Sequence, residues 1–256
     1  MADVLYRPSQ HEAPLDEPWD AAKAEDAIAA IVADAEAGCD GTMLAARALG
    51  FDDLWQESAE LLWAQWDTET NLWTHDLYGK TIQSLGPAHG FAGCVHALRG
   101  FRDDELRRRA SEVLEREALR DGDLANWPPL AGTPDPEKVR VQWCHGAAGI
   151  VSTLGDLMPL DLATAGAELV WRAGPIERGS GLCHGTAGNG YALLKLHELT
   201  GDELWLDRAR RFAMHAIAQV ERERGRYTLW TGDVGVALYL RSCLDADARL
   251  PGFDVF

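Results

Sequence analysis

The chain has few basic residues for its length. Its 256 residues include 24 lysines and arginines against 41 aspartates and glutamates, so the formal net charge is −17. Nucleic acids and anionic membranes both attract proteins through a basic surface. We therefore expect neither a nucleic acid nor a membrane as the partner of this protein.

Long hydrophobic runs and a secretory signal are also absent. No apolar run approaches the roughly 20 residues of a membrane-spanning helix. The opening sequence MADVLYRP has neither the basic nor the apolar region of a signal peptide. The five cysteines are an odd number and lack the spacing of a small disulfide scaffold. These absences predict a cytoplasmic protein whose reduced thiols are available to a metal.

Strand-like alternation is scarce, and helical spacing dominates. Only residues 139–143 and 226–230 alternate as short strands do, whereas residues 52–66 and 203–220 carry apolar side chains three and four apart opposite a charged face. Buried helices are apolar on most faces, as are the stretches 147–157, 191–199 and 234–244. Amphipathic outer helices alternating with buried inner helices predict an all-α fold, an α/α toroid, as a single domain over residues 1–256.

A glycine phrase, x-Gly-x-x-Gly, precedes an apolar stretch five times. The copies lie at residues 37–41, 89–93, 145–149, 184–188 and 231–235, at steps typical of stacked helical pairs. A loop that turns into the N-terminus of an inner helix needs the conformational freedom and close approach of glycine. We therefore expect the residues before the first glycine of each copy to lie at one end of the barrel.

Two copies of the phrase carry a Cys-His pair. Cys144-His145 and Cys183-His184 lie 39 residues apart, and thiolate and imidazole are ligands that zinc prefers. All four side chains together would form a closed, structural Cys₂His₂ site, whereas three would leave the fourth position open for catalysis. Adjacent residues seldom reach the same metal, but that objection applies to both pairs, so the spacing leaves both alternatives open.

The phrases GPAHGFAG, QWCHGAAG and GLCHGTAGNGY resemble the lanthionine synthetase C-like family, and the likeness runs from about residue 38 to the end. The opening Leu5-Tyr6-Arg7-Pro8 is similar to bacterial members. The resemblance implies an α/α toroid of seven inner and seven outer helices, but we count five glycine loops. The sequence passes from a predicted helix over about 19–37 directly to the first loop. Two early repeats are thus expected to be absent, so that the ring either opens or closes with a smaller radius.

The same resemblance implies roles for individual residues. It implies a Zn²⁺ ion bound by three side chains, which are Cys144, Cys183 and His184. His89, at the equivalent place in a third His-Gly loop, is expected to act as the acid, and Arg140, which matches a family arginine, to stabilise negative charge. His145 is then expected to line the cavity as an acid, a base or a thiolate-orienting group.

The activity that the resemblance implies is zinc-dependent addition of a thiol to dehydroalanine or dehydrobutyrine. The thiol would come from the same peptide, giving a thioether ring, or from glutathione, and a cyclase would need a separate dehydratase as partner. An alternative is a non-catalytic zinc- or glutathione-binding protein with a shortened toroid. A carbohydrate-active α/α barrel is disfavoured, because it needs facing carboxylates and the inner stretches hold few acids.

Overall fold

The computed structural model describes residues 40–77, 79–132, 139–177, 179–222 and 227–255. The chain divides into two compact units, Met1–Ala37 and Gly38–Phe256, and the description below concerns the second unit. The helix predicted over about 19–37 and the start of the first glycine loop lie outside the described residues. The assignment of residues 1–256 to one domain stays a prediction.

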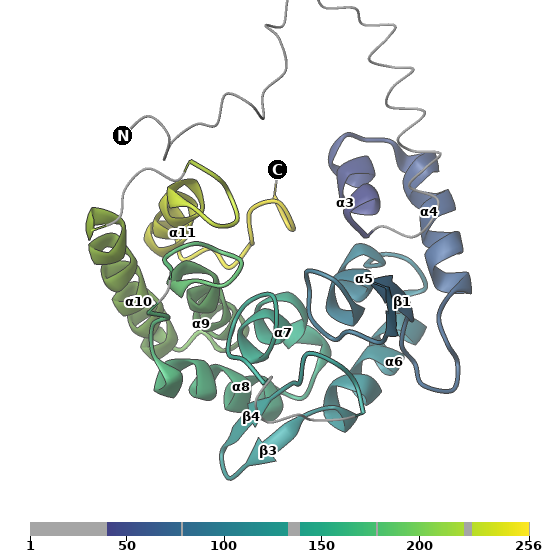
Figure 1. Ribbon diagram of the computed structural model, residues 1–256, viewed down its shortest axis with the longest axis horizontal. Helices are drawn as coiled ribbons and strands as arrows, with labels where there is room; N and C mark the ends of the chain where they lie inside the picture. Colours follow the sequence, from purple (N-terminus) through teal and green to yellow (C-terminus); the bar gives the residue numbers. More distant parts are fainter. Residues whose placement is uncertain (1–39, 78, 133–138, 178, 223–226, 256) are drawn as a thin grey trace, which may run out of the picture. The chain divides into compact units, whose positions relative to one another are not determined.

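The helices of the second unit alternate between an inner and an outer set. The inner helices are α3 (Asp40–Ala48), α5 (Phe91–Ala97), α7 (Ala147–Leu154), α9 (Thr186–Thr200) and α11 (Asp233–Asp245). The outer helices are α4 (Asp52–Ala64), α6 (Asp103–Arg116), α8 (Leu160–Ala173) and α10 (Glu203–Arg222). Each inner helix packs against the next inner helix along the chain, and most also pack against an outer helix (Figure 1). The predicted all-α class, with the inner and outer helices of an α/α toroid, is confirmed.

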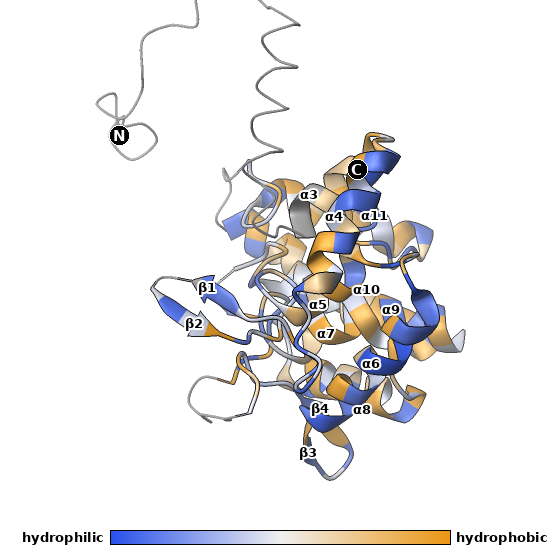
Figure 2. Cartoon of the chain, turned by 90° about the vertical axis from the view of Figure 1, so that its right-hand side faces the viewer, coloured by the Kyte–Doolittle hydropathy of each residue, from blue (hydrophilic) through white to orange (hydrophobic). Residues whose placement is uncertain are grey.

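Burial separates the two sets as the hydrophobic pattern predicts. Every residue of α7 is buried, and the 3₁₀ helix η2 (Gly155–Leu157) continues it. The outer helix α6 instead buries one stripe, which includes Leu106, Ala110 and Val113, and exposes charged residues on its other face. Figure 2 shows this contrast as a mostly orange α7 and a largely blue α6. A helix that is apolar on all faces is stable only inside the layers around it.

Two antiparallel hairpins interrupt the helical pattern. Strands β1 (His75–Leu77) and β2 (Lys80–Ile82) lie between α4 and α5, and strands β3 (Leu119–Asp121) and β4 (Leu124–Asn126) follow α6. The sequence placed its strands elsewhere, and this prediction was wrong for residues 139–143, which form a loop. Their backbone acceptors bind side-chain amides, since Asn189 donates to the Val141 carbonyl at 2.8 Å. Of the segment 226–230, residue 226 lies outside the described residues and the rest forms a loop and turn.

Glycine permits a close approach of backbone at the start of the inner helices. A Cβ at Gly149 would overlap the Trp143 carbonyl, and a Cβ at Gly188 would overlap the Leu182 carbonyl. In both loops the carbonyl six residues before the glycine thus lies against the first helical turn. Each of these carbonyls belongs to the residue before a cysteine of a Cys-His pair. The second glycine of the phrase therefore determines the position of the backbone from which the cysteine side chain extends.

Substitution of Gly188 by alanine should destabilise the protein by about 3 kcal/mol or more, because the added methyl group meets backbone that cannot move aside. Gly155→Ala is the matched control. The nearest atoms to its Cβ would belong to side chains and not to backbone: those of Lys195 at 3.3 Å, Leu199 at 3.4 Å and Val151 at 3.7 Å. Denaturant unfolding followed by circular dichroism measures both variants. Equal midpoints for the two variants would contradict the proposed role of the close approach.

Candidate metal centre

The histidine-bearing glycine loops end at the N-termini of three neighbouring inner helices. Gly90, Gly146 and Gly185 directly precede α5, α7 and α9. Backbone hydrogen bonds join the later loops to one another: the Cys144 amide donates to the Cys183 carbonyl at 3.0 Å, and the Cys183 amide donates to the Trp230 carbonyl at 2.8 Å. The loops therefore form one surface at the positive ends of the helix dipoles, where anionic groups are stabilised.

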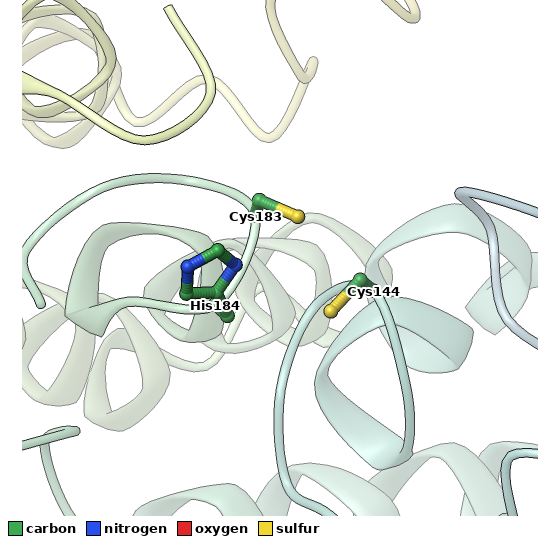
Figure 3. A group of neighbouring side chains, drawn as sticks. All are labelled: Cys144, Cys183 and His184. Atoms are coloured by element: carbon green, nitrogen blue, oxygen red, sulfur yellow. The ribbon is translucent and has the colours of Figure 1, made fainter. Parts of the chain in front are cut away.

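Three side chains of this surface are placed to hold a metal ion. The Sγ atoms of Cys144 and Cys183 and a ring nitrogen of His184 all lie within 4.8 Å of one another. The two thiols come from different loops and point into the space between them, with the His184 imidazole alongside (Figure 3). Burial falls from Cys144, which is buried, through Cys183 to His184, which is exposed. One side of the group is thus open to an incoming ligand.

The donor set fits zinc. Two thiolates and one imidazole are soft and borderline ligands that zinc binds in preference to magnesium or calcium. Zinc–sulfur bonds of about 2.3 Å and zinc–nitrogen bonds of about 2.0 Å at tetrahedral angles separate the ligand atoms by roughly 3.5 Å. The three atoms lie within 4.8 Å of one another, so small side-chain rotations would bring them to that spacing. Cys144, Cys183 and His184 would therefore hold the ion through three bonds and leave a fourth position for another ligand.

The two thiols share one proton before any metal binds. A hydrogen bond from Cys144 lowers the pKa of Cys183 to about 6, against the opposing effect of burial, and His184 and His89 add to the lowering. The same hydrogen bond and burial raise the pKa of Cys144 far above its ordinary value. Cys183 is therefore the thiolate at neutral pH and Cys144 is the hydrogen-bond donor. A preformed thiolate is what a cation needs for its first bond.

Alkylation of the metal-free protein should show this polarisation. In the presence of a chelator, the rate at which iodoacetamide modifies Cys183 should rise with pH, with a midpoint near pH 6. The thiolate reacts, and it forms at that pKa. Cys144→Ala removes the donor, so the midpoint should rise toward the ordinary value of 9.0. Cys243 is the internal control, since burial raises its pKa to about 11. Peptide mass spectrometry separates the sites, and an unchanged midpoint in Cys144→Ala would rule out the shared proton.

The three residues predicted to be catalytic interact with this group or with one another. The exposed His89 precedes α5, and its charge acts on Cys183 and on His145. Burial, His89 and Arg140 lower the pKa of His145, so its imidazole is neutral at neutral pH. The exposed Arg140 lies close enough to exert that effect and remains cationic. The structure thus brings His89 close to Cys183 and brings Arg140 close to His145.

The geometry favours a three-ligand site over a closed Cys₂His₂ site. The metal-ligand group found in the described part of the chain contains Cys144, Cys183 and His184 and does not include His145. The Nδ1 atom of His145 is buried and has no hydrogen-bond partner among the described residues. It lies 3.3 Å from the position that a Cβ on Gly86 would occupy, so this nitrogen is turned toward the loop that precedes His89.

Two further residues near the site were missed by the sequence reasoning. The β1 residue His75 has a buried Nε2 without a partner among the described residues, and burial and His89 lower its pKa. Asn126 ends β4, and its side chain accepts from the Ala147 amide at 2.7 Å and donates to the Arg140 carbonyl at 3.2 Å. Asn126 therefore holds both ends of the Cys144 loop. Both residues lie in the long connections that precede the histidine loops. Their place in these connections is the only feature of the sequence that could have pointed to them.

Comparison with protein-family models matches residues 51–255 to the description "Lanthionine synthetase C-like protein". The chain belongs to this family. Among curated relatives, the chain is 30% identical to LanC-like protein GCL1 from Arabidopsis thaliana over 189 aligned residues. This alignment covers 66% of this chain and 43% of the relative. It is 32% identical over 145 residues to Glutathione S-transferase LANCL1 from Danio rerio, covering 51% of this chain and 35% of the relative. The chain thus spans less than half the length of these relatives.

The family assignment agrees with the resemblance that the Cys-His-Gly phrases carry. The matched region includes every described residue of the candidate metal centre. Within the described residues, no helix combines the length and hydropathy that crossing a bilayer requires.

Proposed function

We propose that this lanthionine synthetase C-like chain uses a zinc ion to activate a thiol for addition to dehydroalanine or dehydrobutyrine. The observation that carries the proposal is the convergence of Cys144, Cys183 and His184 within 4.8 Å. His89 acts on Cys183, and Arg140 acts on the neighbouring His145. The zebrafish relative is named a glutathione S-transferase, and this name supports glutathione as one thiol donor. Addition from a cysteine of the same peptide, with a separate dehydratase preparing the peptide, is the other form of the reaction.

The reaction adds the thiol across a carbon–carbon double bond. Zinc bound by two thiolates and an imidazole would lower the pKa of a thiol in the fourth position. The sulfur lone pair forms a bond to the β-carbon, and the π electrons move to the α-carbon and the adjacent carbonyl as an enolate. The α-carbon then takes up a proton. The proton released by the thiol replaces the one consumed, so neither an oxidant nor a reductant is needed.

Residues of this chain can stabilise the enolate and transfer the proton. Arg140 is cationic and exposed beside His145, so it can bind the enolate oxygen as negative charge develops. His89 is exposed on the same surface, and it donates the proton to the α-carbon and recovers one from the thiol. The neutral His145 accepts a hydrogen bond from the incoming thiol or orients its sulfur.

Incubation of zinc-loaded protein with glutathione and a dehydroalanine peptide tests the proposal. We expect a peptide mass increased by one glutathione, formed faster than in buffer containing free zinc. A second peptide with a cysteine and a dehydroalanine should lose its free thiol without a change in mass when a thioether ring forms. Zinc-loaded protein that accelerates neither reaction would exclude the catalytic function.

A second candidate function is binding of zinc and glutathione without catalysis. The observation that favours it is the exposed side of the Cys144, Cys183 and His184 group, because a fourth position on the metal can hold a thiol whether or not addition follows. Isothermal titration of zinc-loaded protein with glutathione distinguishes the candidates when combined with the rate measurement. Binding without acceleration supports this second function, whereas binding with acceleration supports the first.

A further inference from the structure

The segment that follows α11 reaches the aromatic residues beneath the metal centre. The ring of Phe253 lies edge-on to Trp143, with centroids 5.3 Å apart, and its centroid is 6.3 Å from that of Trp230. The two tryptophans stack on each other at 4.7 Å and an interplanar angle of 30°. Phe253 therefore completes a cluster of three aromatic rings. Trp143 is buried, with 1% of its surface exposed, so its position depends on what packs against it.

Both tryptophans are connected directly to the thiol ligands. Trp143 precedes Cys144 in the chain, so rotation of its backbone moves the first thiol. The Trp230 carbonyl accepts the hydrogen bond of the Cys183 amide at 2.8 Å. The stacked pair thus links the loop of one sulfur to the loop of the other, and Phe253 closes the stack from the side.

The segment around Phe253 is itself held firmly. The Leu250 amide donates to the Asp254 carboxylate at 2.7 Å, and the Phe253 amide donates to the Leu250 carbonyl at 3.1 Å. His96 of α5 anchors the turn from the other side. Its Nε2 atom lies 3.4 Å from the Phe253 carbonyl and 3.4 Å from the Asp254 carboxylate. The His96 ring also packs on the Phe253 ring at 4.9 Å.

We propose that Phe253 is a positioning residue for the metal centre. It fixes the Trp143–Trp230 stack and thereby holds the sulfurs of Cys144 and Cys183 at metal-binding separation. The inference rests on the proposed zinc site and extends it to a residue from the far end of the described chain. Groups that orient ligands without touching the metal change affinity by about 10–100-fold when removed. The cavity left by Phe253→Ala should let Trp143 tilt, so the preformed spacing of the thiols is lost.

Metal affinity tests the inference without reference to turnover. Competition with a chromophoric chelator should show that Phe253→Ala binds zinc about 10-fold or more weakly than the wild type. Cobalt substitution should show altered d–d and thiolate charge-transfer bands, because the ligand geometry changes. Phe101→Ala is the matched control. Its ring packs edge-on against Trp55 and Trp63 at 6.4 and 5.7 Å, away from the thiol loops, so its affinity and cobalt spectrum should match the wild type.

The conservative variant Phe253→Leu separates positioning from folding. Leucine refills most of the space, so it should recover most of the affinity and the wild-type cobalt bands. Wild-type affinity in Phe253→Ala would overturn the inference, as would equal losses in Phe253→Ala and Phe101→Ala. If Phe253→Ala does not fold, the comparison passes to Phe253→Val, which leaves part of the space empty and should bind zinc more weakly than Phe253→Leu. Equal affinities and cobalt spectra in these two variants would then overturn the inference. A wild-type protein that binds no zinc would instead contradict the proposed function.

Discussion

The Cys183→Ala protein is expected to retain no stoichiometric zinc. Cys183 contributes the thiolate that is already formed near neutral pH, since the hydrogen bond from Cys144 lowers its pKa to about 6. Its removal leaves a thiol and an exposed imidazole, a set too weak to hold zinc against a chelator. The loss should exceed the roughly 10–100-fold effect of removing a residue that only orients a ligand. Elemental analysis of purified protein, with the wild type at one zinc per chain, measures it.

Cys243→Ala is the control for the loss of a thiol elsewhere. Cys243 lies buried in α11, outside the group that can hold a metal, and its pKa is raised by burial to about 11. This variant should keep its zinc, although the small cavity reduces stability. Full zinc in Cys183→Ala would show that the Cys-His phrases do not form the site. Zinc loss in Cys243→Ala alone would place the metal in another part of the chain.

Much of the inner framework was predictable because one local rule repeats. Each described glycine phrase ends in an inner helix, so the sequence placed α7 and α11 to within a few residues. The stretch 191–199 located α9 but missed its first turn, since α9 runs over Thr186–Thr200. The stretch 147–157 became α7 followed by η2, as a fully apolar pattern indicates. Charged faces likewise located the outer helices α4 and α10. The periodic spacing of apolar side chains and the glycines at the helix starts determine these elements. Both can be read from residues that are close together in the sequence.

The parts that sequence reasoning missed depend on contacts between distant residues. Asn126 holds the Cys144 loop through the Arg140 carbonyl and the Ala147 amide, and no local pattern shows that an asparagine at the end of a short strand will do so. The alternation at 139–143 resembled a strand, but the Arg140 and Val141 carbonyls accept hydrogen bonds from amide side chains instead of from a neighbouring strand. The role of Phe253 likewise follows only from where its ring lies. The spacing of apolar residues along a short segment cannot predict contacts between residues that are far apart in the sequence.

A change of His89 to glutamine should abolish most of the addition reaction and leave zinc bound. His89 is exposed on the loop before α5 and is not part of the metal-ligand group among the described residues. Loss of a positioned acid costs about 10²–10⁴-fold in rate. Initial rates of glutathione addition to a dehydroalanine peptide, measured by mass spectrometry, give the effect. His197→Gln is the matched control, because His197 lies in the last turn of α9, at the opposite end of that helix from the thiols.

The configuration of the product gives an independent test of His89 as the proton donor. An acid fixed on one face of the enolate delivers the proton to that face, so the wild type should give one α-carbon configuration. The slow product of His89→Gln should contain both configurations, because water protonates either face. Chiral analysis of the hydrolysed thioether amino acid measures the ratio. A slow variant that still gives one configuration would assign the proton to another group, and Arg140 would then bind the enolate beside a different acid. A variant that loses zinc as well as activity would instead place His89 among the residues that hold the metal.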